Sequence, residues 1–376
     1  MKKILVIAAA ALAFAACSKT EVLMPEAASI DFAPNALSTK ALVLPNGNAG
    51  TTQNFPDDQT FNVFAFADFD GPNANTYVTN YKTPLMNDVT IGNQNGDWKA
   101  ILAPGEDPYL WPATGTVDFY AYYPSSLTAV FDTLAAPKGI KLNDVVLGSS
   151  VGDQIDPLVA STLAQSAPNK PKVGIVFKHI TSQIAVTAFD ATKTKSLRGK
   201  IALEKVTFKN MKTSGNYTEG STTGKGTWSS INTKADFTSF SGKEVLDTLE
   251  SYLSADQFSS AINNSAAFVV IPEDILEVDN TNNTHQYIEV QYSVKSYTVN
   301  GLVYPAIPTQ TINIPLFGKG VTGETLQNGK RYVFHLGLSL DKANNEIMFA
   351  PQVDGWDTED INGITVDVVN NVLMNN

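Results

Sequence analysis

Short runs of apolar and polar residues in alternation dominate the chain after residue 28. Residues 29–32 alternate strictly, whereas residues 61–66 are apolar on nearly both faces. Val, Ile, Thr and aromatic residues are dense in these runs, as expected of pleated, half-buried β-strands. The same pattern predicts further strands at residues 117–123, 173–177, 182–189, 201–208, 266–271, 287–299, 309–316, 332–340 and 347–350.

Turn signals separate the predicted strands. Asn-Gly pairs, whose two residues both tolerate the positive φ of tight hairpins, begin at Asn46, Asn95, Asn300, Asn328 and Asn362. The segment 287–316, centred on the Asn300-Gly301 pair, is the clearest predicted hairpin. Helical periodicity supports one short helix, over residues 245–262.

Many short strands between turns indicate an all-β sandwich architecture and argue against alternating βαβ units. The length of 376 residues predicts two domains. A linker is indicated between Ala167 and Pro171, where two prolines bracket polar residues. We therefore predict an N-terminal β-sandwich over residues 28–170 and a C-terminal β-sandwich over residues 171–376.

The N-terminus has the pattern of a bacterial lipoprotein precursor. Two lysines precede the apolar residues 4–16, a segment too short to span a membrane, and Cys17 follows a pair of alanines. Phe14 stands where a lipobox more often has Leu. We predict a signal peptide over residues 1–16, lipidation of Cys17, and a tether over residues 17–27. An ordinary secretory signal followed by an unmodified cysteine is the alternative.

Composition excludes several function classes. The net charge is −11 and Arg198 and Arg331 are the only arginines, so nucleic acid and anionic lipid headgroups are poor partners. The single cysteine excludes an intrachain disulfide framework and a cysteine-based zinc site. The three histidines lie far apart in the sequence. We predict neither a metal nor a cofactor.

Catalytic motifs are absent from the sequence. It has no glycine-rich phosphate-binding loop, no H-E-x-x-H and no G-x-S-x-G nucleophile elbow. His179 lies between apolar Phe177 and Ile180 on a strand-like segment, and we interpret it as a structural residue. Acidic clusters at residues 57–58, 68–70 and 357–360 lack calcium-loop spacing and read as solvated loops. We predict that the protein is not an enzyme; a hydrolase with unrecognised carboxylates is the weakest alternative.

Aromatic residues crowd the stretch from Trp98 to Tyr123, which includes Trp111. Alternation within residues 117–123 would bury half of them, which favours a sandwich core with aromatic rims. The alternative is a stacking platform for sugars at Trp98 and Trp111. Under that alternative the protein would be a surface glycan-binding lipoprotein.

Three stretches resemble the fimbrillin (Mfa-like, type V pilin) lipoproteins. The most specific is Y-L-W-P-A-T-G-T-V-D-F-Y-A-Y-Y-P at residues 109–124, and V-F-K-H-I-T-S-Q-I at residues 176–184 is the second. K-V-T-F-K-N follows at residues 205–210. The resemblance implies two transthyretin-like β-sandwich domains in tandem and export as a lipidated precursor. It also implies polymerisation by donor-strand exchange, after a trypsin-like surface protease removes the first strand.

The resemblance suggests both a cleavage site and a donor strand. The family's protease is typically Arg-specific, but no arginine precedes Arg198, so the bond between Lys40 and Ala41 is the candidate site. Residues 364–373 are the possible donor strand, with Ile364, Val366 and Val368 alternating on one face. The alternative is that this tail is the last strand of its own domain. A chain that is never cut would instead be a tip or anchor subunit.

Together these features predict a structural subunit of cell-surface fimbriae that supports adhesion. Its expected partners are identical or related fimbrial subunits and the cell outer membrane, reached through the lipid on Cys17. A surface glycan or protein of the host or of another bacterium is a possible further ligand. We expect the protein at the outer membrane and in the fimbrium.

Overall fold

The structure of this chain is a computed structural model. It describes residues 28–36, 55–68, 84–112, 115–132, 139–166, 172–220, 223–246, 267–272, 285–316, 326–340, 346–349, 352–353, 364–367 and 372–374. The predicted signal peptide, Cys17 with its tether, the Lys40–Ala41 bond and Val368 lie outside these residues. Within them strands are the main regular structure, joined by loops and by two 3-10 turns, η1 (Val151–Asp153) and η2 (Lys195–Leu197).

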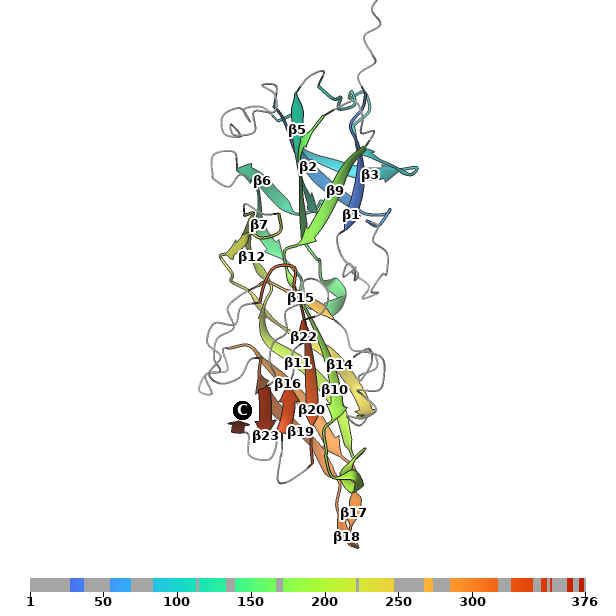
Figure 1. The fold of residues 1–376 in the computed structure, drawn as a ribbon, viewed down its shortest axis with the longest axis vertical. Coiled ribbons are helices and arrows are strands. Elements are labelled where there is room, and N and C mark those ends of the chain that lie inside the picture. Colours follow the sequence, from blue (N-terminus) through green and yellow to red (C-terminus); the bar gives the residue numbers. More distant parts are fainter. Residues whose placement is uncertain are drawn as a thin grey trace, which may run out of the picture.

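The N-terminal part is a closed barrel (Figure 1). Its seven strands are, in order around the barrel, β1 (Asp31–Ala36), β4 (Asp97–Ala100), β3 (Met86–Gln94), β2 (Thr60–Asp68), β5 (Thr116–Tyr123), β8 (Leu158–Gln165) and β9 (Lys172–His179). Neighbouring strands are antiparallel except β1 and β9, which are parallel and close the barrel. Phe32, Phe61, Phe119 and Phe177 are fully buried in its interior.

A second sheet covers one outer side of the barrel. Its order is β13 (Thr227–Ser229), β12 (Ser214–Thr218), β7 (Gly139–Val146) and β6 (Thr128–Asp132). Phe64 on β2 and Tyr122 on β5 point outward from the barrel and pack with Leu142 and Tyr217 of this sheet. The strands β2 and β5 are therefore buried on both faces, which explains why residues 61–66 are apolar on nearly both faces.

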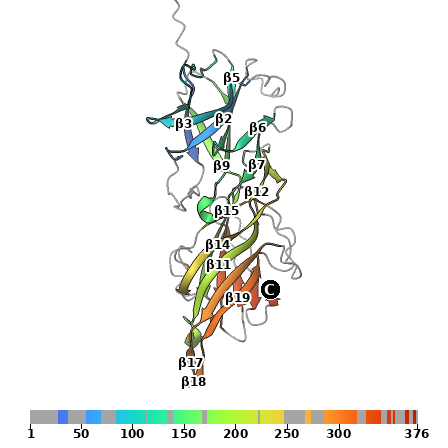
Figure 2. The same ribbon diagram turned by 180° about the vertical axis from the view of Figure 1, so that it is seen from behind.

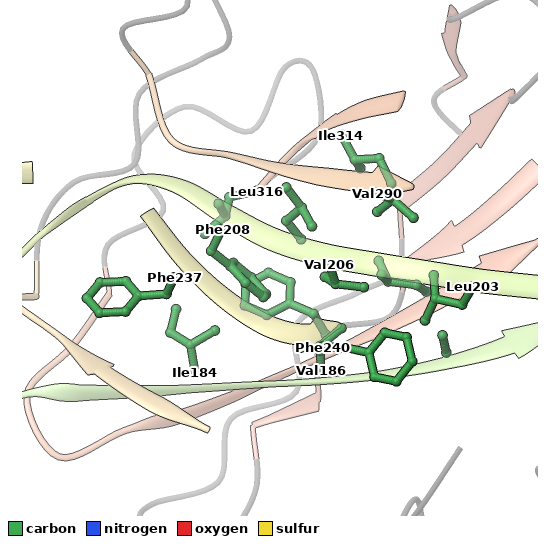
Figure 3. Packing of buried hydrophobic residues seen from close by; sticks show 14 of the residues in the cluster. Ile184, Val186, Leu203, Val206, Phe208, Phe237, Phe240, Val290, Ile314 and Leu316 are labelled. Carbon is green, nitrogen blue, oxygen red and sulfur yellow. The ribbon is translucent and has the colours of Figure 1, made fainter. Parts of the chain in front are cut away.

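The C-terminal part is a two-layer sandwich. One sheet has the order β15 (Phe268–Val270), β10 (Ser182–Asp190), β20 (Arg331–Leu338), β21 (Glu346–Phe349), β23 (Ile364–Asp367) and β24 (Val372–Met374), with β22 (Gln352–Val353) also paired to β20. The other has the order β14 (Lys234–Val245), β11 (Ile201–Lys212), β16 (Tyr287–Val294) and β19 (Ile307–Pro315). Figure 3 shows the apolar side chains that the two sheets bury between them.

The predicted hairpin around Asn300-Gly301 is confirmed. The strands β16 and β19 pair along their length, and β17 (Tyr297–Val299) and β18 (Leu302–Tyr304) extend the hairpin beyond the sandwich. Asn300 and Gly301 have φ values of 49° and 79°, the left-handed pair that a tight hairpin turn needs. Figures 1 and 2 show β17 and β18 at the end of the molecule farthest from the barrel.

The all-β fold with two successive domains is confirmed. The strands β12 and β13, however, follow residue 171 in sequence and pair with β7 in the sheet that covers the barrel. The chain thus enters the sandwich with β10 and β11, returns to the barrel, and enters the sandwich again with β14. The predicted helix over residues 245–262 does not begin at Val245, which is the last residue of β14; the rest of that range lies almost wholly outside the described residues.

Candidate functional site

The place where the barrel closes is occupied by β1. It pairs with β9 in parallel through six successive residues, from Asp31 opposite Lys172 to Ala36 opposite Phe177. On its other side it pairs with β4 at one position, Phe32 opposite Trp98. The strand β1, the first in the part of the chain that the structure describes, therefore lies between two strands that come much later in the sequence.

Side chains of this first strand complete the barrel core. Ile30 and Phe32 are 3% and 0% exposed, and the Phe32 ring meets Phe61 and Phe119 edge-on, with ring centroids 6.1 and 5.7 Å apart. Just before the strand, the Ile30 amide donates to the Tyr109 carbonyl at 2.9 Å. Because Phe32 is fully buried, its side chain contributes about 2–3 kcal/mol of hydrophobic free energy.

Removal of this strand would convert the barrel into an acceptor for another strand. The facing edges of β4 and β9 would each lose a partner for their backbone groups. The interior beside Trp98, Phe61 and Phe119 would become open to water. An apolar slot between two unpaired edges is the geometry that an extended peptide fills by adding a strand.

The C-terminal tail lies in the sandwich of its own chain. Ile364 of β23 pairs with Phe349 of β21, and Val366 pairs with Ile347 on one side and Leu373 of β24 on the other. The tail is the far end of its sheet, because β24 is the last strand in the order. Donation of this tail to another subunit would require it to leave β21.

Trp98 and Trp111 are buried in the barrel and are not surface platforms. They are 7% and 6% exposed. The Trp98 ring lies 5.4 Å from that of Phe55, and the Trp111 ring lies 5.7 Å from that of Phe119. Neither ring has an open face on which a sugar could stack, so the glycan alternative loses the observation that supported it.

His179 ends β9 and belongs to a buried polar cluster where the barrel meets the sandwich. Its Nδ1 lies 2.7 Å from Asp156 Oδ2, and the Thr181 hydroxyl donates to Asp156 Oδ1 at 2.9 Å. All three residues are at most 6% exposed. The Asp156 carboxylate thus holds both ends of the short connection between β9 and β10. The sequence predicted a structural histidine but did not indicate Asp156 as its partner.

Gln154 forms a second buried link at this junction. Its side-chain amide donates to the Val269 carbonyl at 2.6 Å and accepts from the Val269 amide at 2.7 Å, so it pairs with β15 as a backbone group would. Gln154 is fully buried. Sequence reasoning missed this residue; its one local signal is that Gln154 and Asp156 alternate with Ile155 and Pro157.

Glu219 is a buried carboxylate in the turn between β12 and β13, 5% exposed. The Gly224 amide donates to its Oε1 at 3.3 Å, and its Oε2 has no hydrogen-bond partner among the described residues. Burial raises the pKa of Glu219 to about 7 from its ordinary value of 4.5. The folded protein therefore keeps a proton that the unfolded chain releases at lower pH.

Because the folded protein holds this proton more tightly than the unfolded chain does, the free energy of unfolding falls as the pH rises from about 4.5 to about 7. We expect Glu219→Gln to remove that loss, because a neutral amide has no charge to desolvate. The variant should exceed the wild type by about 2 kcal/mol in free energy of unfolding at pH 8, and match it near pH 4. Urea unfolding at the two pH values measures the difference. An equal gain in free energy of unfolding at both pH values would contradict the raised pKa of Glu219.

The described residues contain no group of three or more His, Cys, Asp or Glu side chains placed to hold a metal ion. In the same part of the chain, no helix has the length and hydrophobicity needed to cross a membrane.

The fimbrillin-like family model matches residues 47–356 of this sequence. The chain belongs to the fimbrillin-like family. The match spans the barrel from β2 onward and most of the sandwich. Membership makes this fimbrillin-like chain a structural, non-enzymatic protein of cell-surface fimbriae that associates with other fimbrial subunits.

A solved structure has a similar fold. A fimbrial protein from Bacteroides vulgatus superimposes with a TM-score of 0.51 at 17% sequence identity, over 87% of this chain and 99% of that one. The tip fimbrial protein Mfa3 from Porphyromonas gingivalis, with C-terminal truncation, matches with a TM-score of 0.34 at 10% identity, over 88% of this chain and 100% of that one. No curated protein sequence matches significantly.

Proposed function

We propose that this fimbrillin-like protein is a fimbrial subunit that polymerises by donor-strand exchange. In this proposal residues 364–373 of one subunit take the place of β1 in the next. The observation that carries the proposal is the position of β1: this strand, the first among the described residues, closes the barrel and precedes the candidate cleavage site at Lys40.

The side-chain spacing of β1 supports the exchange. Ile30, Phe32 and Pro34 are buried, whereas Asp31 and Ala33 between them are half-buried, so the strand presents every second residue to the core. Ile364, Val366 and Val368 have the same spacing. An incoming tail can therefore put apolar side chains into the slot in the same period as the strand it replaces.

Cleavage after Lys40 would couple assembly to export. The cut would separate β1 and the lipid anchor at Cys17 from the rest of the subunit, so the slot opens as the subunit leaves the membrane. A chain that keeps its first strand would accept no donor strand and would stay tethered, as an anchor or accessory subunit. Backbone hydrogen bonds to both β4 and β9 would make release of a donated strand slow.

The proposal is tested with purified full chain cut by a lysine-specific protease and analysed in SDS without boiling. We expect a ladder of multimers from the cut wild type, and monomer alone from Lys40→Ala and from a chain lacking residues 364–376. Val366→Asp should abolish the ladder, whereas the matched Thr365→Asp, on the other face of the tail, should retain it. A ladder from the truncated chain, or monomer alone from the cut wild type, would overturn the proposal.

A further inference from the structure

The hairpin at the far end of the sandwich exposes large apolar side chains. Leu302, Val303 and Ile307 are 64%, 74% and 41% exposed. Tyr297 and Tyr304 stack across the hairpin, with ring centroids 4.9 Å apart and an interplanar angle of 11°. The ring pair stiffens the hairpin, so these apolar side chains are presented on a defined structure.

Basic residues lie beside this hairpin and at its base. The segment 191–200 lies beside it, since η2 contacts β17 and the Lys295 amide donates to the Lys200 carbonyl at 2.9 Å. We call residues 191–200 and 295–307 together the hairpin pole. They contain five cationic residues and no Asp or Glu, namely Lys193, Lys195, Arg198, Lys200 and Lys295. Lys195 and Lys295 are exposed.

Two carboxylates lie next to the hairpin pole, and both are engaged by other groups. Glu204 accepts from the hydroxyls of Ser293 and Thr309 at the base of the hairpin and pairs with Lys243 at 3.1 Å. Asp190 is fully buried, and its two oxygens accept from the amides of Thr192 and Gly199 at 2.9 and 2.7 Å. Its two oxygens thus hold the two ends of the loop that carries the lysines. The hairpin pole is an apolar, positively charged end on a chain whose net charge is −11.

The opposite end of the molecule has the complementary character. We call residues 101–110 the loop pole. They contain Glu106 and Asp107, both exposed, and exposed Ile101 and Leu110 at 53% and 42%. The two lysines that flank this loop, Lys99 and Lys172, are both paired with Asp97, at 3.4 and 3.0 Å. The loop is ordered by a hydrogen bond of 2.8 Å from the Ala103 amide to Glu106 Oε2.

Strand pairing places the loop pole at the free end of the barrel. The strand β9 runs toward the sandwich and ends at His179, and β1 runs parallel to it, so the start of β1 is the end farthest from the sandwich (Figure 1). Ser29, just before β1, bridges to Leu110 of the loop pole. The two poles therefore lie at opposite ends of the folded molecule.

We propose that the hairpin pole of one copy of this chain docks on the loop pole of the next copy. The two surfaces are complementary in charge, and each has exposed apolar side chains to bury. An interface between different surfaces of identical chains is not self-closing and generates an open filament. The inference rests on the proposed function, because the slot of β1 opens beside the loop pole, where a tail from the docked copy would enter.

A cross-linking experiment tests the contact itself. Cleavage after Lys40 removes Cys17, the only natural cysteine, so introduced thiols react alone. The double variant Leu110→Cys/Val303→Cys, polymerised and treated with a short bismaleimide, should give a ladder that survives boiling in SDS. Each single variant should give at most dimers. The matched control pairs Leu110→Cys with Val146→Cys, because Val146 is 58% exposed on β7, away from both poles, and should give no ladder.

Unboiled wild-type samples separate the two proposals. If they show the SDS-resistant ladder while the boiled double variant shows none, the docking inference fails and donor-strand exchange stands. If the unboiled wild type shows no ladder, the proposed function fails and the docking inference fails with it. A ladder from the Val146 control equal to that of the double variant would also overturn the docking.

Charge reversal tests the electrostatic attraction between the hairpin pole and the loop pole. Lys195→Glu/Lys295→Glu should slow polymer formation about tenfold at low salt, since such charges act mainly on the association rate. Combining it with Glu106→Lys/Asp107→Lys should restore the rate, because the attraction is re-formed with the signs exchanged. High salt should reduce the difference. A combined variant as slow as Lys195→Glu/Lys295→Glu alone would contradict the pairing of the two poles.

Discussion

Replacing Phe32 by alanine is expected to lower the free energy of unfolding of the uncut barrel by about 3–5 kcal/mol. The side chain is fully buried and contacts Phe61 and Phe119, on strands that its own strand does not pair with. The truncation therefore leaves a cavity in the centre of the barrel. Trp98 and Trp111 are buried in the same core, so their fluorescence during urea unfolding reports the barrel.

The same substitution distinguishes a removable strand from a permanent one. After cleavage at Lys40 the subunit no longer contains Phe32, so a polymer assembled from Phe32→Ala chains should be as stable as the wild-type polymer. Asp31→Ala, on the half-buried face of the same strand, is the control and should change the stability of the uncut chain by less than about 0.5 kcal/mol. A polymer weakened by Phe32→Ala would show that the first strand is retained.

Removal of the Asp156 carboxylate is expected to cost about 2–4 kcal/mol. Asp156→Ala leaves the buried His179 Nδ1 and the Thr181 hydroxyl without the oxygens they contact at 2.7 and 2.9 Å. Because these residues flank the passage from β9 to β10, the loss should loosen the junction of barrel and sandwich. Limited proteolysis of the folded chain should then cut near residue 180 much faster than in the wild type.

Asp156→Asn provides the matched comparison. The amide oxygen can still accept from Thr181, so about half of the loss should be recovered. Equal destabilisation by the alanine and asparagine variants would mean that the negative charge, and not the hydrogen bonds, holds the junction. No destabilisation by either would show that Asp156 is dispensable there.

Local chemistry explains the parts of the fold that the sequence predicted. The hairpin around Asn300-Gly301 was predictable because the turn depends on two residues that tolerate positive φ. The runs at 117–123 and 182–189 were predictable because dense β-branched and aromatic residues favour strands in almost any setting. Strands with polar sequences, such as β3 (M-N-D-V-T-I-G-N-Q), lacked this signal and were missed.

Contacts between distant segments explain the parts that it did not predict. The run 61–66 shows two apolar faces, but the sequence does not say that one faces the barrel interior and the other Leu142 and Tyr217. Trp98 and Trp111 left two interpretations open, because an aromatic residue suits both a core and a binding surface. Burial decided between them, since both rings lie inside a barrel closed by strands far away in sequence.

The sequence by itself determined that this is an all-β, two-domain chain with a lipoprotein-like start and an alternating apolar tail. These features are periodicities and short motifs, each contained within a few consecutive residues. Only the tertiary structure decided that β1 closes the barrel against β9, that β12 returns to the barrel, and that Asp156 meets His179. Such pairings depend on which edges and buried groups remain unsatisfied once the other strands are in place, and that is a property of the assembled sheets.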